Sequence, residues 1–124
     1  MDITLSALPG SYSIVRLDED SDIPAWATSS AFFSVTKTDD ELSIVCEDES
    51  VPEEVKAERN WRMFKVAGPL DLSLTGIASS ILKPLAEAEI GVFVISTHDT
   101  DYILVKNDRF EEAKTVLSEH FTVN

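Results

Sequence analysis

The sequence predicts an α+β protein made of two similar halves, each an antiparallel sheet with helices on one face. Three observations support this fold class. β-prone runs alternate with helix-like segments, a β-hairpin pattern recurs at an offset of 60 residues, and a helix-like segment follows each hairpin. A chain of 124 residues is long enough to bury a core without disulfides or metals.

The first elements expected are short strands. Residues 3–8 and 11–17 are β-prone runs, and Pro9-Gly10 between them is a dipeptide typical of turns. An acidic loop at 18–22 follows, and residues 24–28 have room for one helical turn.

A hairpin and a short helix are expected next. Residues 31–36 (AFFSVT) and 42–47 (LSIVCE) are β-rich runs joined by five polar residues, which is a hairpin pattern. Residues 52–58 then indicate a short helix. Pro52 lies near its start, where the missing N–H costs nothing, and two glutamates suit its first turn.

The second half begins with a strand and a longer helix. Residues 61–67 (WRMFKVA) form a β-prone run that ends at Gly68-Pro69. A helix is expected from Thr75-Gly76 to about Glu89, bent at Pro84 because proline removes a backbone donor. Its apolar stripe consists of Ile77, Ile81, Leu82, Leu85 and Ala86.

A second hairpin and a last helix complete the pattern. Residues 91–96 and 102–106 are the two β-rich runs. Asp108 stands where an N-cap would, and Glu111 follows three residues later, as in a capping box. Residues 122–124 add a closing strand.

The two hairpins align without a gap at the offset of 60, and the helix after each also matches. Each half therefore has the order strand, helix, strand, strand, helix and closing strand, which is the ferredoxin-like βαββαβ plan. We expect two such units in tandem, residues 1–60 with a truncated first helix and residues 61–124.

Charge restricts the partners. Twenty-three acidic residues face ten basic ones, for a net charge of −13, so nucleic acid and anionic membrane surfaces are not expected to bind. The first residues lack the basic start and apolar run of a signal peptide, and no apolar stretch approaches the roughly 20 residues of a membrane span. We expect a cytoplasmic protein. Cys46, the only cysteine, is expected to be a small buried hydrophobic residue.

No motif for catalysis or metal binding stands out. With two histidines and one cysteine, the sequence does not suit a zinc site, and it lacks the common nucleophile and phosphate-loop motifs. We therefore expect no enzyme activity, no metal and no cofactor. A small enzyme using Asp99 or Asp101 as a base stays open as a minor alternative.

One candidate binding element is the start of the longer helix. Free N–H groups at a helix start attract a carboxylate or phosphate, and Gly76 lets a ligand approach the backbone closely. An ordinary N-cap made by Thr75 is the alternative. The candidate residues here are Leu74, Thr75, Gly76 and Ile77.

The second candidate element is the turn of the later hairpin. Its carboxylates can hold an ammonium group if the turn lies near the helix start. An anion-attracting helix start beside carboxylates would suit a zwitterion such as an amino acid. The candidate residues here are Thr97, His98 and Asp101.

Three stretches carry a resemblance to a known family: residues 64–71, residues 74–77 (LTGI) and residues 95–105 (ISTHDTDYILV). They resemble the ACT-domain family, in particular its small standalone bacterial proteins. They are also similar to the regulatory domains of aspartate kinase and to the CASTOR arginine sensors. Residues 8–12 and 32–36 fit as well, so the resemblance spans nearly the whole chain.

The resemblance implies a tandem ACT fold that binds an amino acid between units as a non-catalytic regulatory or sensor module. It assigns the α-carboxylate to the backbone around Gly76 and an ammonium or basic side chain to Asp101, while His98 stands where relatives are expected to carry an aromatic ring. Expected partners are a free amino acid and either a second copy of the chain or a regulated protein. The alternative is a protein-interaction or structural module with a vestigial ligand pocket.

Overall fold

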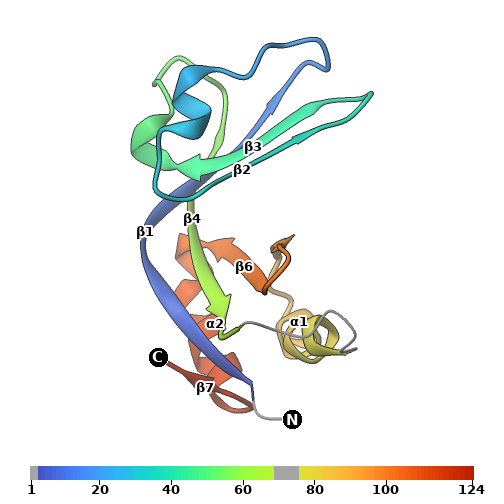
Figure 1. The fold of residues 1–124 in the computed structure, drawn as a ribbon. Coiled ribbons are helices and arrows are strands. Elements are labelled where there is room, and N and C mark those ends of the chain that lie inside the picture. The colour runs from blue at the N-terminus through green and yellow to red at the C-terminus, as the bar shows by residue number, and fades with distance from the viewer. Residues whose placement is uncertain (1–2, 69–75) are drawn as a thin grey trace. The chain divides into compact units, whose positions relative to one another are not determined.

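The computed structural model describes residues 3–68 and 76–124 and divides the chain into two compact units (Figure 1). Unit 1 consists of residues 1–9 and 62–124, and unit 2 of residues 10–61. The fold is mixed α/β, with antiparallel strand pairs in both units and, among the described residues, two α-helices in unit 1.

The first strand, β1 (Thr4–Leu17), runs without interruption across the unit boundary. The prediction of two strands separated by a turn at Pro9-Gly10 is therefore wrong. The strand continues through the dipeptide, with Gly10 at a φ of 91°, a backbone conformation that residues with a side chain rarely adopt. Pro9-Gly10 marks the boundary between units instead of a chain reversal.

Unit 2 contains the first predicted hairpin. Strands β2 (Phe33–Lys37) and β3 (Leu42–Glu47) pair antiparallel, and β3 also pairs antiparallel with the later part of β1. Two short 3₁₀ turns, η1 (Ala25–Thr28) and η2 (Asp48–Ser50), complete the unit together with the start of β4 (Glu58–Val66). Its buried core residues are Val15, Ala27, Leu42, Ile44, Cys46 and Val51.

The helix predicted at residues 52–58 does not form. A turn follows η2 instead, and β4 already begins at Glu58. The physical reason is Arg59, whose guanidinium donates hydrogen bonds to the carbonyl oxygens of Pro52 at 2.9 Å and Val55 at 3.1 Å. The Pro52 carbonyl also accepts the N–H of Val55 at 3.1 Å, so the segment makes one turn that the Arg59 side chain holds and that does not continue as a helix.

A carboxylate ties three segments of unit 2 together. The hydroxyl of Ser13, fully buried in β1, donates to the side chain of Asp48 in η2. The backbone N–H of Asn60 donates to Oδ2 of the same carboxylate at 3.2 Å. Asn60 has a φ of 63°, so Asp48 holds β4 where its backbone is irregular.

We predict that Asp48→Ala lowers the free energy of unfolding by about 1–3 kcal/mol, because it leaves the buried Ser13 hydroxyl and the Asn60 amide without their acceptor. Urea unfolding measures the change. Asp39→Ala, in an exposed turn, is the control and should change stability by less than about 0.5 kcal/mol. Equal effects of the two substitutions would contradict this assignment.

Unit 1 contains the remaining elements. After β4 come α1 (Ile77–Glu87), the antiparallel hairpin of β5 (Phe93–Ser96) and β6 (Asp101–Lys106), α2 (Phe110–Ser118) and β7 (Thr122–Val123). In the sheet, β6 lies between β4 and β5, and β7 pairs parallel with the start of β1. The predicted second hairpin, both helices and the closing strand are confirmed, and α1 continues through Pro84.

The predicted cap of the last helix is wrong. Asp108 lies inside a 3₁₀ turn, η3 (Asn107–Arg109), and the N-cap position of α2 belongs to Arg109, which makes no side-chain cap hydrogen bond. The extra turn moves the helix start two residues past the predicted cap.

Both helices of unit 1 cover one face of its sheet. Their buried residues share a core with alternate residues of β1, β4 and β6, as expected for strands whose successive side chains point to opposite faces. The main members of this core are Leu5, Phe64, Val66, Ile77, Ile81, Leu85, Ile103, Val105, Phe110, Ala113 and Leu117.

The two hairpins correspond at an offset of 59 residues, not 60. The N–H of Thr38 donates to the carbonyl of Glu41 at 2.9 Å, and the N–H of Thr97 donates to that of Thr100 at 2.8 Å. Ile44 and Cys46 face the core of unit 2, and at this offset their counterparts are Ile103 and Val105, which face the core of unit 1. The turns, not the gapless sequence match, therefore fix the correspondence.

Arg109 joins the end of α1 to the start of α2. It donates to the backbone carbonyls of Ala88 and Glu89, each at 3.3 Å, and to the carboxylate of Glu112 at 2.8 Å. The hydrogen bond from Arg109 is the main reason that the pKa of the Glu112 carboxyl lies below its ordinary value.

This shift gives a pH-dependent prediction. A lowered pKa in the folded state stabilises the fold above the unfolded value of about 4.3, and the contribution disappears as pH falls through the folded pKa. The melting temperatures of wild type and Glu112→Gln should therefore differ most near neutral pH and converge in acid. Glu111→Gln, in the same turn, controls for net charge, and a difference that grows in acid would refute the assignment.

Candidate functional site

Hydrogen bonds gather three segments at one end of the unit 1 sheet. The hydroxyl of Thr100, in the β5–β6 turn, donates to the carbonyl of Val66 at the end of β4, at 2.5 Å. The N–H of Ala67 donates to the carbonyl of Thr4 in β1 at 2.8 Å. Ile77, the first residue of α1, belongs to the same buried core as Val66. The hairpin turn and the end of the strand that precedes α1 therefore lie at the same end of the sheet.

Among the residues that the structure describes, no side-chain cap hydrogen bond is made at the start of α1. Gly76 occupies the N-cap position with a φ of 82°, and the first turn carries no acidic residue. Apart from Gly76 itself and its two chain neighbours, no described atom lies within 4 Å of the point where a β-carbon on Gly76 would sit. By contrast, α2 carries two glutamates in its first turn. The start of α1 is thus the helix end that keeps its attraction for an anion.

Of the four residues predicted here, Gly76 and Ile77 begin the helix as expected. Ile77 is buried, so only its backbone is available to a ligand. Leu74 and Thr75 lie outside the described residues.

The hairpin turn places its predicted residues in different surroundings. The Thr97 hydroxyl donates to the carbonyl of Thr100 at 3.1 Å and so closes the turn. The side chains of His98 and Asp99 are 85% and 70% exposed and contact each other, with 2.9 Å between Nδ1 and Oδ1. The structure therefore puts His98 in solvent at the tip of the hairpin.

Asp101 has the position best suited to a ligand. It is half-buried, and it lies on the helix-covered face of β6 because it alternates with Ile103 and Val105. Its counterpart in the other hairpin is the fully buried Leu42. Among residues 3–68 and 76–124, no side chain pairs with the Asp101 carboxylate, which is therefore available for an ammonium or guanidinium group.

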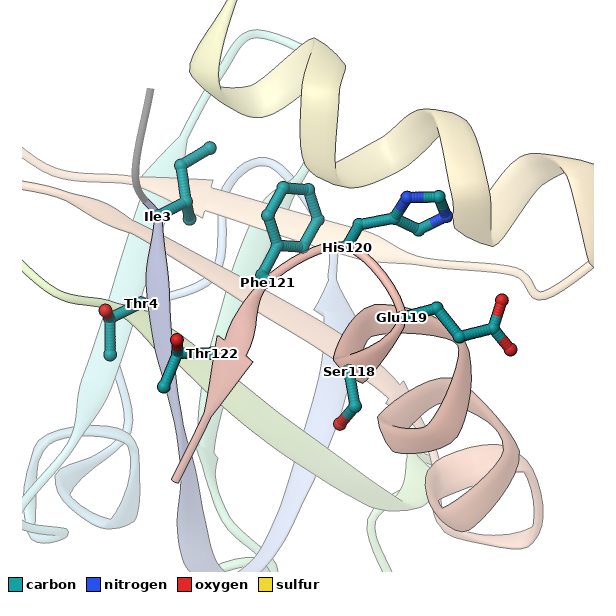
Figure 2. A pocket seen from close by; sticks show the side chains of 7 residues that line it. All are labelled: Ile3, Thr4, Ser118, Glu119, His120, Phe121 and Thr122. Atoms are coloured by element: carbon teal, nitrogen blue, oxygen red, sulfur yellow. The ribbon is translucent and has the colours of Figure 1, made fainter.

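A hollow of about 610 Å³ opens at the same end of unit 1 (Figure 2). It lies between the end of α2 and the start of β1, where Thr4 accepts the hydrogen bond from Ala67. Sequence reasoning missed these residues, since nothing in the repeat indicates that β1 joins unit 1. The lining residues are Ile3, Thr4, Ser118, Glu119, His120, Phe121 and Thr122.

Other chemistry is sparse in the part of the chain that the structure describes. No three side chains of the metal-ligating types come together there, and no helix is long and apolar enough to cross a membrane.

Cys46 is fully buried, as predicted. Burial, and then the nearby carboxylates of Asp48 and Glu47, raise the pKa of its thiol.

Comparison with known proteins identifies the family. The ACT-domain family model matches residues 56–119, and a second model, described as an N-terminal domain, matches residues 10–54. The chain belongs to the ACT-domain family.

Curated relatives include arginine sensors. The human protein CASTOR3P is 30% identical over 109 residues, which cover 77% of this chain and 67% of that protein. The human cytosolic arginine sensor for mTORC1 subunit 1 is 30% identical over 103 residues, which cover 74% of this chain. This chain spans only 31% of the length of the sensor.

Solved structures agree on the fold. Protein Atu0741 of Agobacterium tumefaciens is 41% identical, with a TM-score of 0.93 over 100% of this chain and 93% of that one. The aspartate kinase of Clostridium acetobutylicum is 14% identical, with a TM-score of 0.69 over 96% of this chain and 34% of the kinase. At that identity, the likeness to the kinase shows the fold alone.

We predict that the Cys46 thiol reacts slowly with a disulfide reagent such as Ellman's in the folded protein, because it is buried and its pKa is raised. The reaction should be fast in urea, where the chain is unfolded and the thiol is exposed. Labelling of the native protein at the rate of the unfolded chain would contradict the assignment of Cys46 as an inert core residue.

Proposed function

We propose that this protein is a non-catalytic regulatory module that binds a free amino acid in unit 1, between the start of α1 and Asp101. The backbone at Gly76 and the first amides of α1 bind the α-carboxylate. Asp101 binds the α-ammonium or a cationic side chain. The bound amino acid then alters the association of the protein with a second copy or with a regulated partner.

Two features of unit 1 support the proposal: the start of α1 and the carboxylate of Asp101. Within residues 76–124, the start of α1 has no side-chain cap hydrogen bond, and its first turn has no acidic residue. Asp101 directly follows Thr100, whose hydroxyl donates a hydrogen bond to the carbonyl of Val66 at the end of β4. A zwitterion carries the two charges that complement these groups.

The relatives support the same ligand class. Two of them are named for sensing arginine in the cytosol, and arginine carries both an α-carboxylate and a cationic side chain. The cytosolic location in those names also supports the expected cytoplasmic one. Arginine is therefore the first amino acid to test. This chain spans about a third of the length of those sensors, so arginine binding by this chain is a proposal.

We further propose that the chain is a tandem of two ferredoxin-like ACT units, residues 1–60 and 61–124. The matching turn hydrogen bonds of the two hairpins support this duplication. In unit 2, the helices of the plan are reduced to the 3₁₀ turns η1 and η2. The start of β1 would then be an exchanged segment, since it packs with unit 1.

A thermal-shift screen with the twenty amino acids tests the proposal. An amino acid at about 100 times its Kd should stabilise the folded protein by roughly 2.7 kcal/mol. Asp101→Asn should reduce the shift, because it removes the only charge of that side chain. Asp99→Asn is the matched control: it removes an exposed carboxylate of the same turn and should leave the shift unchanged. If millimolar concentrations of all twenty amino acids produce no shift, the proposal is wrong.

A second candidate function, a protein-interaction module with a vestigial pocket, is favoured by one observation. Phe33, at the start of the terminal strand β2 in the sheet order, is 45% exposed, and Ile23 is 53% exposed. A stable complex with a partner protein that forms without any amino acid and is lost in Phe33→Ser would favour this function.

A further inference from the structure

We propose that Thr100 is the positioning residue of the binding site: its buried hydroxyl fixes the hairpin to β4 and thereby sets the position of the Asp101 carboxylate. The inference rests on the proposed function, because it assigns a role within that same site. It concerns a residue that contacts no ligand itself.

The burial of Thr100 sets it apart from the rest of the turn. Its residue is only 5% exposed, and its hydroxyl donates to the carbonyl of Val66 at 2.5 Å. The neighbouring side chains of His98 and Asp99 are exposed. Among the described residues, Thr100 and Ser13 are the two polar residues buried in the core. A buried hydroxyl with one short hydrogen bond holds the segment that carries it.

The other hairpin shows that the turn itself does not need this hydroxyl. Its turn closes with the same backbone hydrogen bond and with the hydroxyl of Thr38 in place of that of Thr97. The counterpart of Thr100 there is Glu41, and that turn is tied to β1 by Arg16, which donates to the carbonyl of Asp40 at 2.9 Å. The buried hydroxyl is therefore an additional anchor, present in the hairpin whose next residue is Asp101.

The anchor acts on Asp101 through the backbone. Asp101 is the first residue of β6 and pairs with Ser96 across the hairpin, directly after the anchored Thr100. A turn that shifts relative to β4 carries the carboxylate with it. Because the strength of a charge-assisted hydrogen bond depends on distance and angle, a small displacement weakens binding of a cation.

The substitution Thr100→Val removes the hydroxyl and keeps the branched shape, while the backbone bond between Thr97 and Thr100 remains. Calorimetric titration with L-arginine and with L-citrulline, whose side chain is uncharged, measures affinity for wild type, Thr100→Val, Asp101→Asn and the double variant. We expect Thr100→Val to weaken arginine binding about tenfold. The loss for citrulline should be smaller if Asp101 holds the cationic side chain, and equal if Asp101 holds the α-ammonium that both compounds carry. In the Asp101→Asn background, Thr100→Val should have no further effect, because the two residues act as a unit. Thr100→Ser keeps the hydroxyl and should therefore bind arginine about as tightly as wild type.

Two results would overturn the inference alone: unchanged arginine affinity in Thr100→Val, or additive effects in the double variant. If wild type binds neither compound nor any other amino acid, the proposed function fails instead. Amide hydrogen exchange without ligand separates the two cases, since Thr100→Val should speed exchange in the β5–β6 hairpin and spare the β2–β3 hairpin. Unchanged exchange rejects the anchor itself. If Thr100→Val does not fold, Thr100→Ala removes the same hydroxyl with less steric demand.

Discussion

The alternation of side chains along β6 is the constraint on which the candidate site depends. Ile103 and Val105 must face the core beneath α1 and α2, so every second residue of the strand is committed to that face. Asp101 shares their face but comes at the strand start, where the sheet ends. A shift of one residue would instead send this carboxylate to the opposite face. The packing of β6 against two helices therefore determines which face of the sheet carries Asp101, the charged group of the proposed site.

Electrostatics distinguishes the two helices of unit 1. The chain carries a large excess of acid, and two glutamates occupy the first turn of α2, where they lie close to its backbone amides. The first turn of α1 has none. In a protein of net charge −13, this gap in the negative charge is informative, because an external carboxylate meets less repulsion there than at the other helix start.

Local patterns predicted the elements whose stability is local. Both hairpins, α1, α2 and the closing strand follow from side-chain periodicity and turn composition. The helix expected at 52–58 failed because Arg59 reaches back to its carbonyls, a contact between residues that no periodicity reveals. The hairpin correspondence was wrong by one residue because hydrogen bonds at the turn, rather than similarity of residues, determine it.

The residues of the candidate site were predictable only where a local sequence pattern indicates them. Gly76 and Asp101 carry signals that can be read along the chain: a glycine before a helix and an acid at the start of a strand. Thr100 and Thr4 do not, since their importance comes from partners in other strands, Val66 and Ala67. The exposed position of His98 also depends on the folded turn.

The path of β1 has a practical consequence for dividing the chain. The two family models match residues 10–54 and 56–119, so neither includes residues 1–9. Leu5 is nevertheless fully buried in the core of unit 1, and Thr4 pairs with Thr122. A fragment trimmed to residues 10–119 would keep β4, α1, β5, β6 and α2 but lose both the start of β1 and β7, which pair with each other. Their loss would expose apolar surface of the unit 1 core and unpaired backbone amides along the cut. Shared strands of this kind make the smallest independently folding piece larger than the piece that sequence similarity outlines.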